Sequence, residues 1–203
     1  MADADQGQAV TGDYEVARAW HLAQDTRGEL TTSFEFALMQ VFEAYERWVV
    51  QAARLVGNPD INYPEVVILH VVRMQERAKD AATIAKLVNR DDLPNVLYTL
   101  RKLVSLGLAE KIKVGSGTYF QATERGRMET DRYAALRSDL LLKSMAQVTD
   151  IDSKLETVNS LLKVMTGLYD GAARETAVIN PVALFPALEE PSGPASNRPH
   201  SKS

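Results

Sequence analysis

The chain has 203 residues, no cysteine and a formal net charge of −4 at pH 7, which excludes disulfide bonds and thiolate metal sites. A content of 45% hydrophobic and 25% charged residues is ordinary for a globular protein. No apolar run approaches the roughly 18 residues of a membrane span, and the acidic start MADADQGQ lacks the basic and apolar regions of a signal peptide. We therefore expect a cytoplasmic protein with no membrane partner.

The first 60 residues predict an arm followed by one long helix. The arm, residues 1–31, begins with a small, polar and acidic segment that is typical of disorder, and Tyr14–Gln24 then carries apolar side chains at helical spacing. A continuous apolar stripe predicts a helix over Thr32–Val56. That helix would be roughly 37 Å long at 1.5 Å per residue, more than the core of a small domain needs. We therefore assign residues 32–60 to contact with a second subunit.

Residues 61–128 hold the most informative pattern. Val66–Met74 is apolar on nearly every side, which predicts a buried helix, and Ile84–Lys111 predicts two short helices, joined by a polar turn, and the start of a strand. In the second short helix, the residues expected to face the core are Leu93, Val96, Leu97, Leu100, Leu103 and Val104. The side chains expected to point away from the core are Asn95, Tyr98, Thr99, Lys102 and Ser105.

The ends of this second helix can also be predicted. Asp91 or Asp92 can cap its first turn, where Pro94 is tolerated because the helix needs no amide bond from that position. Gly107 suits the left-handed residue that ends a helix, so that Leu108 can fold back onto the last turn.

A hairpin is expected after the second helix. The strand-forming runs Ala109–Val114 and Thr118–Ala122 flank Gly115-Ser116-Gly117, and two glycines around a serine suit a tight loop. Thr123 is then expected to cap a further helix that begins with Glu124-Arg125-Gly126-Arg127. A hairpin in this position is the wing of a winged helix-turn-helix.

The C-terminal part predicts more long helices and then a tail. One helix is expected from Arg125 to about Val148, and another starts at Asp150 or Asp152. In the last helix, apolar residues alternate in steps of four and three, which is the spacing of a coiled-coil seam: Ile151, Leu155, Val158, Leu162, Met165 and Tyr169. We assign residues 129–180 to dimerisation helices, and the proline-rich segment 181–203 to a tail outside the core.

The order helix, turn, helix, Gly-Leu, hairpin, Thr-Glu-Arg-Gly-Arg over residues 81–128 resembles the winged helix-turn-helix of the MarR family of bacterial transcription regulators. The resemblance implies a mainly α fold with a small β hairpin, in which long N- and C-terminal helices interlock into a homodimer. It also implies a regulator, with repression as the expected action, that binds double-stranded DNA. Two recognition helices related by a twofold axis would read a pseudo-palindromic operator with half-sites roughly 10 base pairs apart.

Two sets of DNA contacts are expected in that framework. Asparagine can pair with adenine and lysine can donate to guanine, so the outward face of the second helix is expected at base edges through Asn95, Tyr98, Thr99 and Lys102. The alternative is that these are solvated positions of an ordinary helix. Phosphate contacts, which orient the protein without reading sequence, are expected from Lys86, Arg90, Lys111 and Lys113. For each of these cations, the alternative is an unpaired surface charge.

Charge distribution agrees with DNA binding, whereas two motifs depart from the family pattern. Residues 78–128 carry nine basic and five acidic side chains, a local balance of +4 that leaves −8 on the remainder. The turn before the second helix holds Asp91-Asp92 where the family usually carries Ser and Arg, and Gly115-Ser116-Gly117 lacks the Asp-Arg pair of the family wing. A second interpretation is therefore a winged helix protein-interaction or dimerisation module without DNA-binding activity.

No catalytic, metal or cofactor site is predicted. The histidines His21, His70 and His200 lack a second ligand at metal-binding spacing, and His70 is interpreted as a core residue. The MarR resemblance also implies a small aromatic or phenolic ligand, held between the dimer helices and the DNA-binding lobe. The residues nearest to that junction are Trp20, His21, Tyr45, Trp48 and Arg73, for which an ordinary core role is the alternative.

Overall fold

The computed structural model describes residues 21–57 and 59–179, and the described chain divides into two compact units after Ser144. Trp20, most of the short helix predicted at Tyr14–Gln24 and the proline-rich segment 181–203 lie outside the described residues. Residues 21–24, the described end of that predicted helix, are not helical. None of the described helices is long and apolar enough to cross a membrane.

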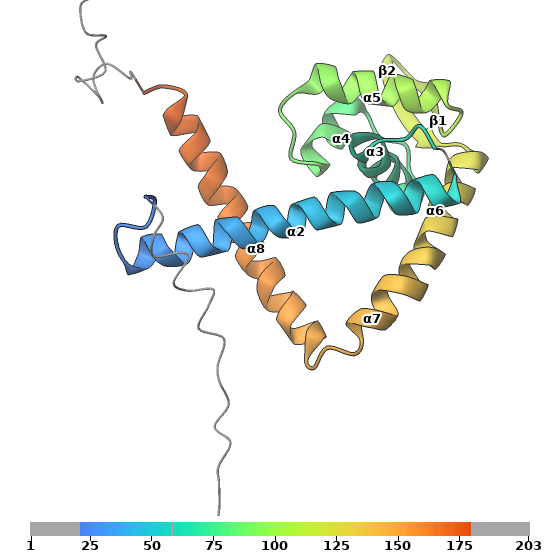
Figure 1. Ribbon diagram of the computed structural model, residues 1–203. Helices are drawn as coiled ribbons and strands as arrows, with labels where there is room; N and C mark the ends of the chain where they lie inside the picture. Colours follow the sequence, from blue (N-terminus) through green and yellow to red (C-terminus); the bar gives the residue numbers. More distant parts are fainter. Residues whose placement is uncertain (1–20, 58, 180–203) are drawn as a thin grey trace, which may run out of the picture. The chain divides into compact units, whose positions relative to one another are not determined.

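The long N-terminal helix α2 spans Thr26–Val56 (Figure 1). It begins at Thr26 rather than at the predicted Thr32, because Asp25 caps it: Oδ1 of Asp25 accepts a hydrogen bond from the Gly28 amide at 2.6 Å. Residues near its end, such as Val49, are part of the core, whereas apolar residues further from the core, such as Val41, are exposed, at 65% for Val41. The part of the predicted apolar stripe that includes Leu38, Val41, Phe42 and Tyr45 is therefore exposed in the described chain.

Three shorter helices build the helical part of the winged helix. The buried helix α3 spans Tyr63–Arg73 and is followed by a 3-10 turn, η1, at Met74–Glu76. Helices α4 (Ala81–Leu87) and α5 (Leu93–Ser105) are joined by a polar turn. The predicted helix-turn-helix is thus confirmed.

The wing is a two-stranded antiparallel sheet. Strand β1 (Ala109–Val114) pairs with β2 (Gly117–Ala122), and Val114 lies opposite Gly117. Gly117 therefore belongs to a strand rather than to the loop, which consists of two residues. Gly115 in that loop has a φ of +60°, a conformation that glycine adopts without steric cost.

Lys79 fixes the wing to the helices. Its backbone exchanges two hydrogen bonds with Phe120 of β2, at 3.0 and 2.8 Å. Its buried ammonium donates to the carbonyl oxygens of Val72 at 3.3 Å, Arg77 at 3.0 Å and Met74. Burial is the main cause that lowers the pKa of Lys79, and the three carbonyls compensate for the missing hydration of the charge.

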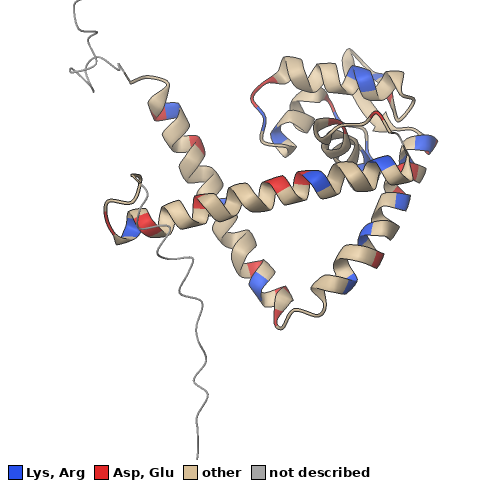
Figure 2. Ribbon diagram, in the orientation of Figure 1, with Lys and Arg blue, Asp and Glu red and all other residues tan. Residues whose placement is uncertain are grey.

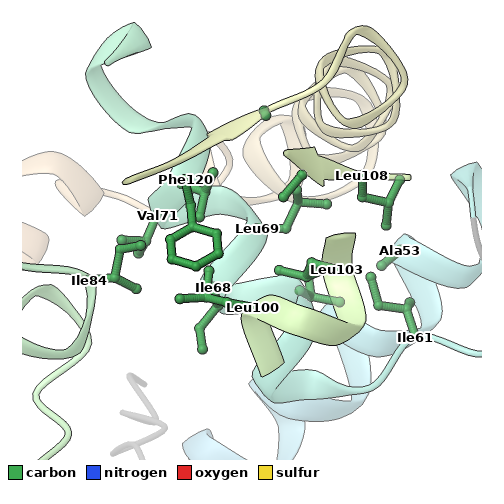
Figure 3. Close-up of a cluster of buried hydrophobic side chains, with 14 of the residues drawn as sticks. Ala53, Ile61, Ile68, Leu69, Val71, Ile84, Leu100, Leu103, Leu108 and Phe120 are labelled. Atoms are coloured by element: carbon green, nitrogen blue, oxygen red, sulfur yellow. The ribbon is translucent and has the colours of Figure 1, made fainter. Parts of the chain in front are cut away.

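One apolar cluster forms the core of the winged helix, as Figure 3 shows. The ring of Phe120 lies among side chains of α3, α4 and α5, including Ile84 and Leu100. Leu103 of α5 lies toward Leu69 of α3 in the same view. All five side chains are buried, so the cluster holds the hairpin and α5 against α3.

The remaining helices follow the wing. Helix α6 (Glu124–Arg137) begins after Thr123, whose hydroxyl accepts the Gly126 amide at 3.1 Å, as predicted. The helical run continues through a π turn at Ser138–Leu142 and α7 (Lys143–Met145), so it stops short of the predicted Val148. In the second unit, α8 spans Ile151–Thr176 and none of its residues is buried by the described chain. Its predicted seam is therefore exposed or half-buried in the described chain.

Gly126 provides a test of how closely α6 approaches the link between α5 and β1. A Cβ at Gly126 would clash with the backbone carbonyl of Leu108, whereas a Cβ at Gly167 in α8 meets no atom within 4 Å. We expect Gly126→Ala to lower the free energy of unfolding by about 1–3 kcal/mol, measured by urea unfolding followed by circular dichroism. The control Gly167→Ala should not destabilise the protein, because alanine favours the helix. Equal effects of the two substitutions would contradict the close approach.

Candidate nucleic-acid interface

Both ends of α5 are fixed by its own sequence. Oδ1 of Asp92 accepts the Asn95 amide at 3.1 Å, and its other carboxylate oxygen accepts from the Asn95 side chain. At the other end, Gly107 has a φ of +71°, and the Leu108 amide reaches the Leu103 carbonyl at 3.0 Å, as in a Schellman motif. The predicted cap and the glycine stop are confirmed, and Asp92 is the residue that caps α5.

The buried face of α5 is rotated from the predicted one. Its fully buried residues are Val96, Thr99, Leu100 and Leu103, whereas Leu97 and Val104 are half-buried and Leu93 is exposed. The predicted outward position of Thr99 is therefore wrong: its side chain is only 6% exposed. The Thr99 hydroxyl donates to the Asn95 carbonyl at 2.9 Å, so its own helix satisfies it inside the core.

Lys102 is held by a carboxylate rather than left free. Its Nζ lies 2.7 Å from Oε1 of Glu65, a side chain near the start of α3 that is almost completely buried. This hydrogen bond is the main cause that raises the pKa of Lys102. Glu65 also completes a capping box: its Oε2 accepts the Asn62 amide at 3.0 Å, and Oδ1 of Asn62 accepts the Glu65 amide at 3.2 Å. The prediction that Lys102 is available to bases therefore needs correction, because its ammonium already has an anionic partner.

The outward face of α5 is formed by Asn95, Tyr98, Arg101 and Ser105, all of which are exposed. Tyr98 has 64% of its surface exposed. Arg101 was not among the predicted contacts, although its place three residues after Tyr98 puts both on one helical face. The sequence did not indicate Arg101, because the apolar residues Leu97 and Val104 suggested a different buried face for α5.

Five cations of the winged helix form no ion pair within the described residues: Lys86 of α4, Arg90 of the turn, Arg101 of α5, and Lys111 and Lys113 of β1. Glu110 alternates with the lysines along β1 and instead accepts a hydrogen bond from Gln121 at 2.6 Å. In α6, by contrast, Arg125 and Arg127 pair with carboxylates of the same helix. Figure 2 shows charges of both signs along the long helices. The winged helix thus carries the predicted phosphate cations without neutralising partners.

A hollow of about 320 Å³ lies between α5 and the hairpin. We call it the α5–hairpin groove. It is lined by Leu97, Arg101, Val104, Lys111, Thr118 and Phe120. Its walls combine three apolar side chains with two cations and one hydroxyl.

The residues predicted to line a ligand pocket have separate surroundings. Trp20 lies outside the described residues, and His21 is exposed before α2. Tyr45 is exposed on α2, with its ring 6.0 Å from that of Tyr63, and Trp48 packs against the core. Arg73 forms ion pairs with Glu76 and, at 3.5 Å, with Asp131. The guanidinium of Arg73 is therefore already occupied by two carboxylates.

His70 lines a much smaller hollow between α2, α3 and α6. This hollow measures about 10 Å³, close to the space that one water needs. Its walls include Glu129, Thr130 and Tyr133, and the His70 ring lies 4.6 Å from the ring of Tyr133, edge to face. The described residues hold no group of three or more carboxylates, histidines or cysteines that could bind a metal ion.

The chain was compared with known protein families and solved structures. Residues 61–126 match the family model described as a winged helix DNA-binding domain, and no curated protein matches the chain. The fold is similar to that of a MarR-family regulator from Rhodococcus sp. RHA1 (15% identity over 70% of this chain and 97% of that one, TM-score 0.55). It is also similar to BldR from Sulfolobus solfataricus (16%, 66% and 96%, TM-score 0.54) and to FabT from Streptococcus pneumoniae, solved in complex with DNA (17%, 70% and 96%, TM-score 0.50).

His70 should make the stability depend on pH. Burial, and secondly the charge of Arg137, lowers the pKa of His70. In the unfolded chain a histidine has a pKa near 6.5, so below that pH the unfolded state binds more protons at this position than the folded state. The contribution of His70 to the free energy of unfolding is therefore complete above that pH and is lost as the pH decreases.

We expect His70→Phe, which keeps a ring beside Tyr133, to show a shallower decrease of stability in acid, by at most about 1.4 kcal/mol per pH unit. Urea unfolding across neutral and acidic pH measures this, with the exposed His21→Phe as the control. Identical pH profiles for wild type and His70→Phe would contradict the assignment.

Proposed function

We propose that this chain, which has the winged helix fold of MarR-family regulators, is a sequence-specific DNA-binding transcription regulator that acts as a homodimer. The observation that supports this most strongly is the set of cations on α4, α5, the turn between them and β1 that form no ion pair within the described residues. Lysine and arginine side chains that lack protein partners can exchange counterions for phosphates, which supplies most of the affinity for duplex DNA. The opposite face of α5 is packed into the core, so the outward face would be held rigidly.

Within this proposal, Asn95 and Tyr98 lie at base edges. Both are exposed on the outward face, and the hydrogen bond from the Asn95 side chain to Asp92 fixes the orientation of the amide. Thr99 has no such role because it is buried. Lys102 would reach DNA only by leaving Glu65, so it acts first as a residue that positions α5. Phosphates are bound by Lys86, Arg90, Lys111 and Lys113.

Exposed apolar faces on two helices support the proposed homodimer. Apolar side chains such as Val41 of α2 and Val158 of α8 are exposed in the described chain, and a second copy would remove such surfaces from water. The two recognition helices would then occupy half-sites roughly 10 base pairs apart, and occupancy would repress transcription. A small aromatic or phenolic ligand that favours another dimer geometry would release the operator. The hollow beside His70 would have to widen to hold it.

One observation favours a second function. Asp91 is exposed beside the start of α5, and the loop of the wing, Gly115-Ser116, has no charge. A carboxylate near phosphate is unfavourable, and a wing loop without a cation cannot hold the minor groove electrostatically. The alternative is therefore a winged helix that binds another protein and has no affinity for duplex DNA.

Selection from a random duplex pool tests the proposed function. Two α5 helices related by a twofold axis should recover a pseudo-palindrome with half-site centres about 10 base pairs apart, and sedimentation should show a dimer at micromolar concentration. The affinity for that duplex should decrease steeply with salt. Recovery of no common sequence, with weak binding at every salt concentration, would instead favour the protein-interaction module.

Asn95→Ala should relax the preference at one base position of each half-site and cost about 1–3 kcal/mol of discrimination. Competition binding with single-base variants of the recovered duplex measures this. Gln51→Ala, a substitution at an exposed position of α2 outside the outward face of α5, is the control. Unchanged selectivity in Asn95→Ala would remove this residue from the base-reading set.

A further inference from the structure

The Asp92 side chain makes two hydrogen bonds to the same neighbour, Asn95, at the start of α5. Its Oδ1 accepts the backbone amide of Asn95 at 3.1 Å, which caps the helix, and its Oδ2 accepts a hydrogen bond from Nδ2 of the Asn95 side chain. The cap needs only the first of these bonds. The second bond holds in one orientation an exposed amide that could otherwise rotate in solvent.

The charge of Asp92 determines which way the Asn95 amide is turned. A carboxylate can only accept hydrogen bonds, whereas the amide has two N–H donors on Nδ2 and one acceptor, Oδ1. The nitrogen must therefore face Asp92, because the reverse orientation would bring the amide oxygen against a carboxylate oxygen. The second N–H and Oδ1 of Asn95 have no hydrogen-bond partner within the described residues. One donor and one acceptor thus remain for a partner outside the chain.

Adenine is the base whose major-groove edge matches one donor and one acceptor. It offers N7 as an acceptor and N6 as a donor, whereas guanine offers two acceptors, N7 and O6. Thymine offers the acceptor O4 and cytosine the donor N4, so each would form only one hydrogen bond with the fixed amide. The negative charge of Asp92, bonded to the same amide, also disfavours the acceptor edges of guanine and thymine. Two hydrogen bonds are therefore possible with adenine alone.

We propose that Asp92 is a positioning residue that restricts Asn95 to adenine, so that each half-site contains an adenine opposite the start of α5. This inference rests on the proposed function, in which α5 is the recognition helix, and the first residues of a recognition helix contact base edges. Asp92 acts through Asn95, because both of its carboxylate oxygens accept hydrogen bonds from that residue. The acidic turn is then a source of base specificity rather than an obstacle to DNA binding.

Asp92→Ser separates the cap from the positioning role. Serine caps helices about as well as aspartate, but its single oxygen accepts the backbone amide and carries no charge to hold the Asn95 side chain. The full chain and the duplex recovered by selection are used, and competition binding compares the four bases at each half-site position. Wild type should prefer adenine at one position by roughly 5- to 150-fold. Asp92→Ser should reduce this preference severalfold, with equal or higher affinity for the other bases, because a negative charge is removed.

The matched control is Asp91→Ser, which removes the neighbouring exposed carboxylate. The carboxylate of Asp91 makes no hydrogen bond to Asn95, whose side chain is bonded to Asp92, so this variant should keep the adenine preference. Asn95→Ala and the double variant Asp92→Ser/Asn95→Ala complete a cycle. Once Asn95→Ala has removed the amide, the substitution at Asp92 should not change the base preference further, because both changes remove the same interaction.

Three outcomes would overturn the positioning role of Asp92 while leaving the regulator proposal intact. The first is an unchanged adenine preference in Asp92→Ser, and the second is a base other than adenine at the position that Asn95→Ala affects. The third is an equal loss of affinity for all four bases in Asp92→Ser, which is the result expected if Asp92 only caps the helix. A wild-type chain without duplex affinity would overturn both this role and the regulator proposal.

Discussion

Burial of the stripe formed by Val96, Thr99, Leu100 and Leu103 sets the rotation of α5 about its own axis. A helix is a rigid element, so the side chains that pack against α3 and the hairpin determine which ones face outward. With this stripe inside, Tyr98 and Arg101 point away from the core, and Lys102 turns toward Glu65. The composition of the candidate DNA-binding face is thus a consequence of core packing.

The same packing determines which charged groups of the winged helix have partners inside the protein. Glu65 is buried, and a buried carboxylate needs hydrogen bonds and a counter-charge, which the Asn62 amide and Lys102 supply. Lys79 is the reverse case, a buried ammonium surrounded by three backbone carbonyls. With these two groups satisfied internally, five other cations of the winged helix form no ion pair within the described residues: Lys86, Arg90, Arg101, Lys111 and Lys113. An acidic chain can therefore carry unneutralised cations on its winged helix.

Helix α2 links the winged helix to the surfaces proposed for assembly. Its last turns provide Val49, Ala52 and Ala53 to the core, whereas its earlier apolar residues are exposed in the described chain. A partner bound to the exposed part would act on a helix that is packed into the winged helix. The hollow beside His70, where α2 meets α3 and α6, is almost filled by side chains. Any ligand there must therefore move one of these helices.

The order of elements was predictable from sequence because it depends on local signals. Asp92, Gly107 and Thr123 define helix ends through their own backbone contacts, and the strand-forming runs around Gly115 define the hairpin. The rotation of α5 was not predictable, because Thr99 looks polar until its hydroxyl is seen bonded to its own helix. The Glu65–Lys102 pair joins α3 to α5, and the α5–hairpin groove exists only where the hairpin packs beside α5. Contacts between segments far apart in the chain depend on tertiary packing, which periodicity along one helix does not contain.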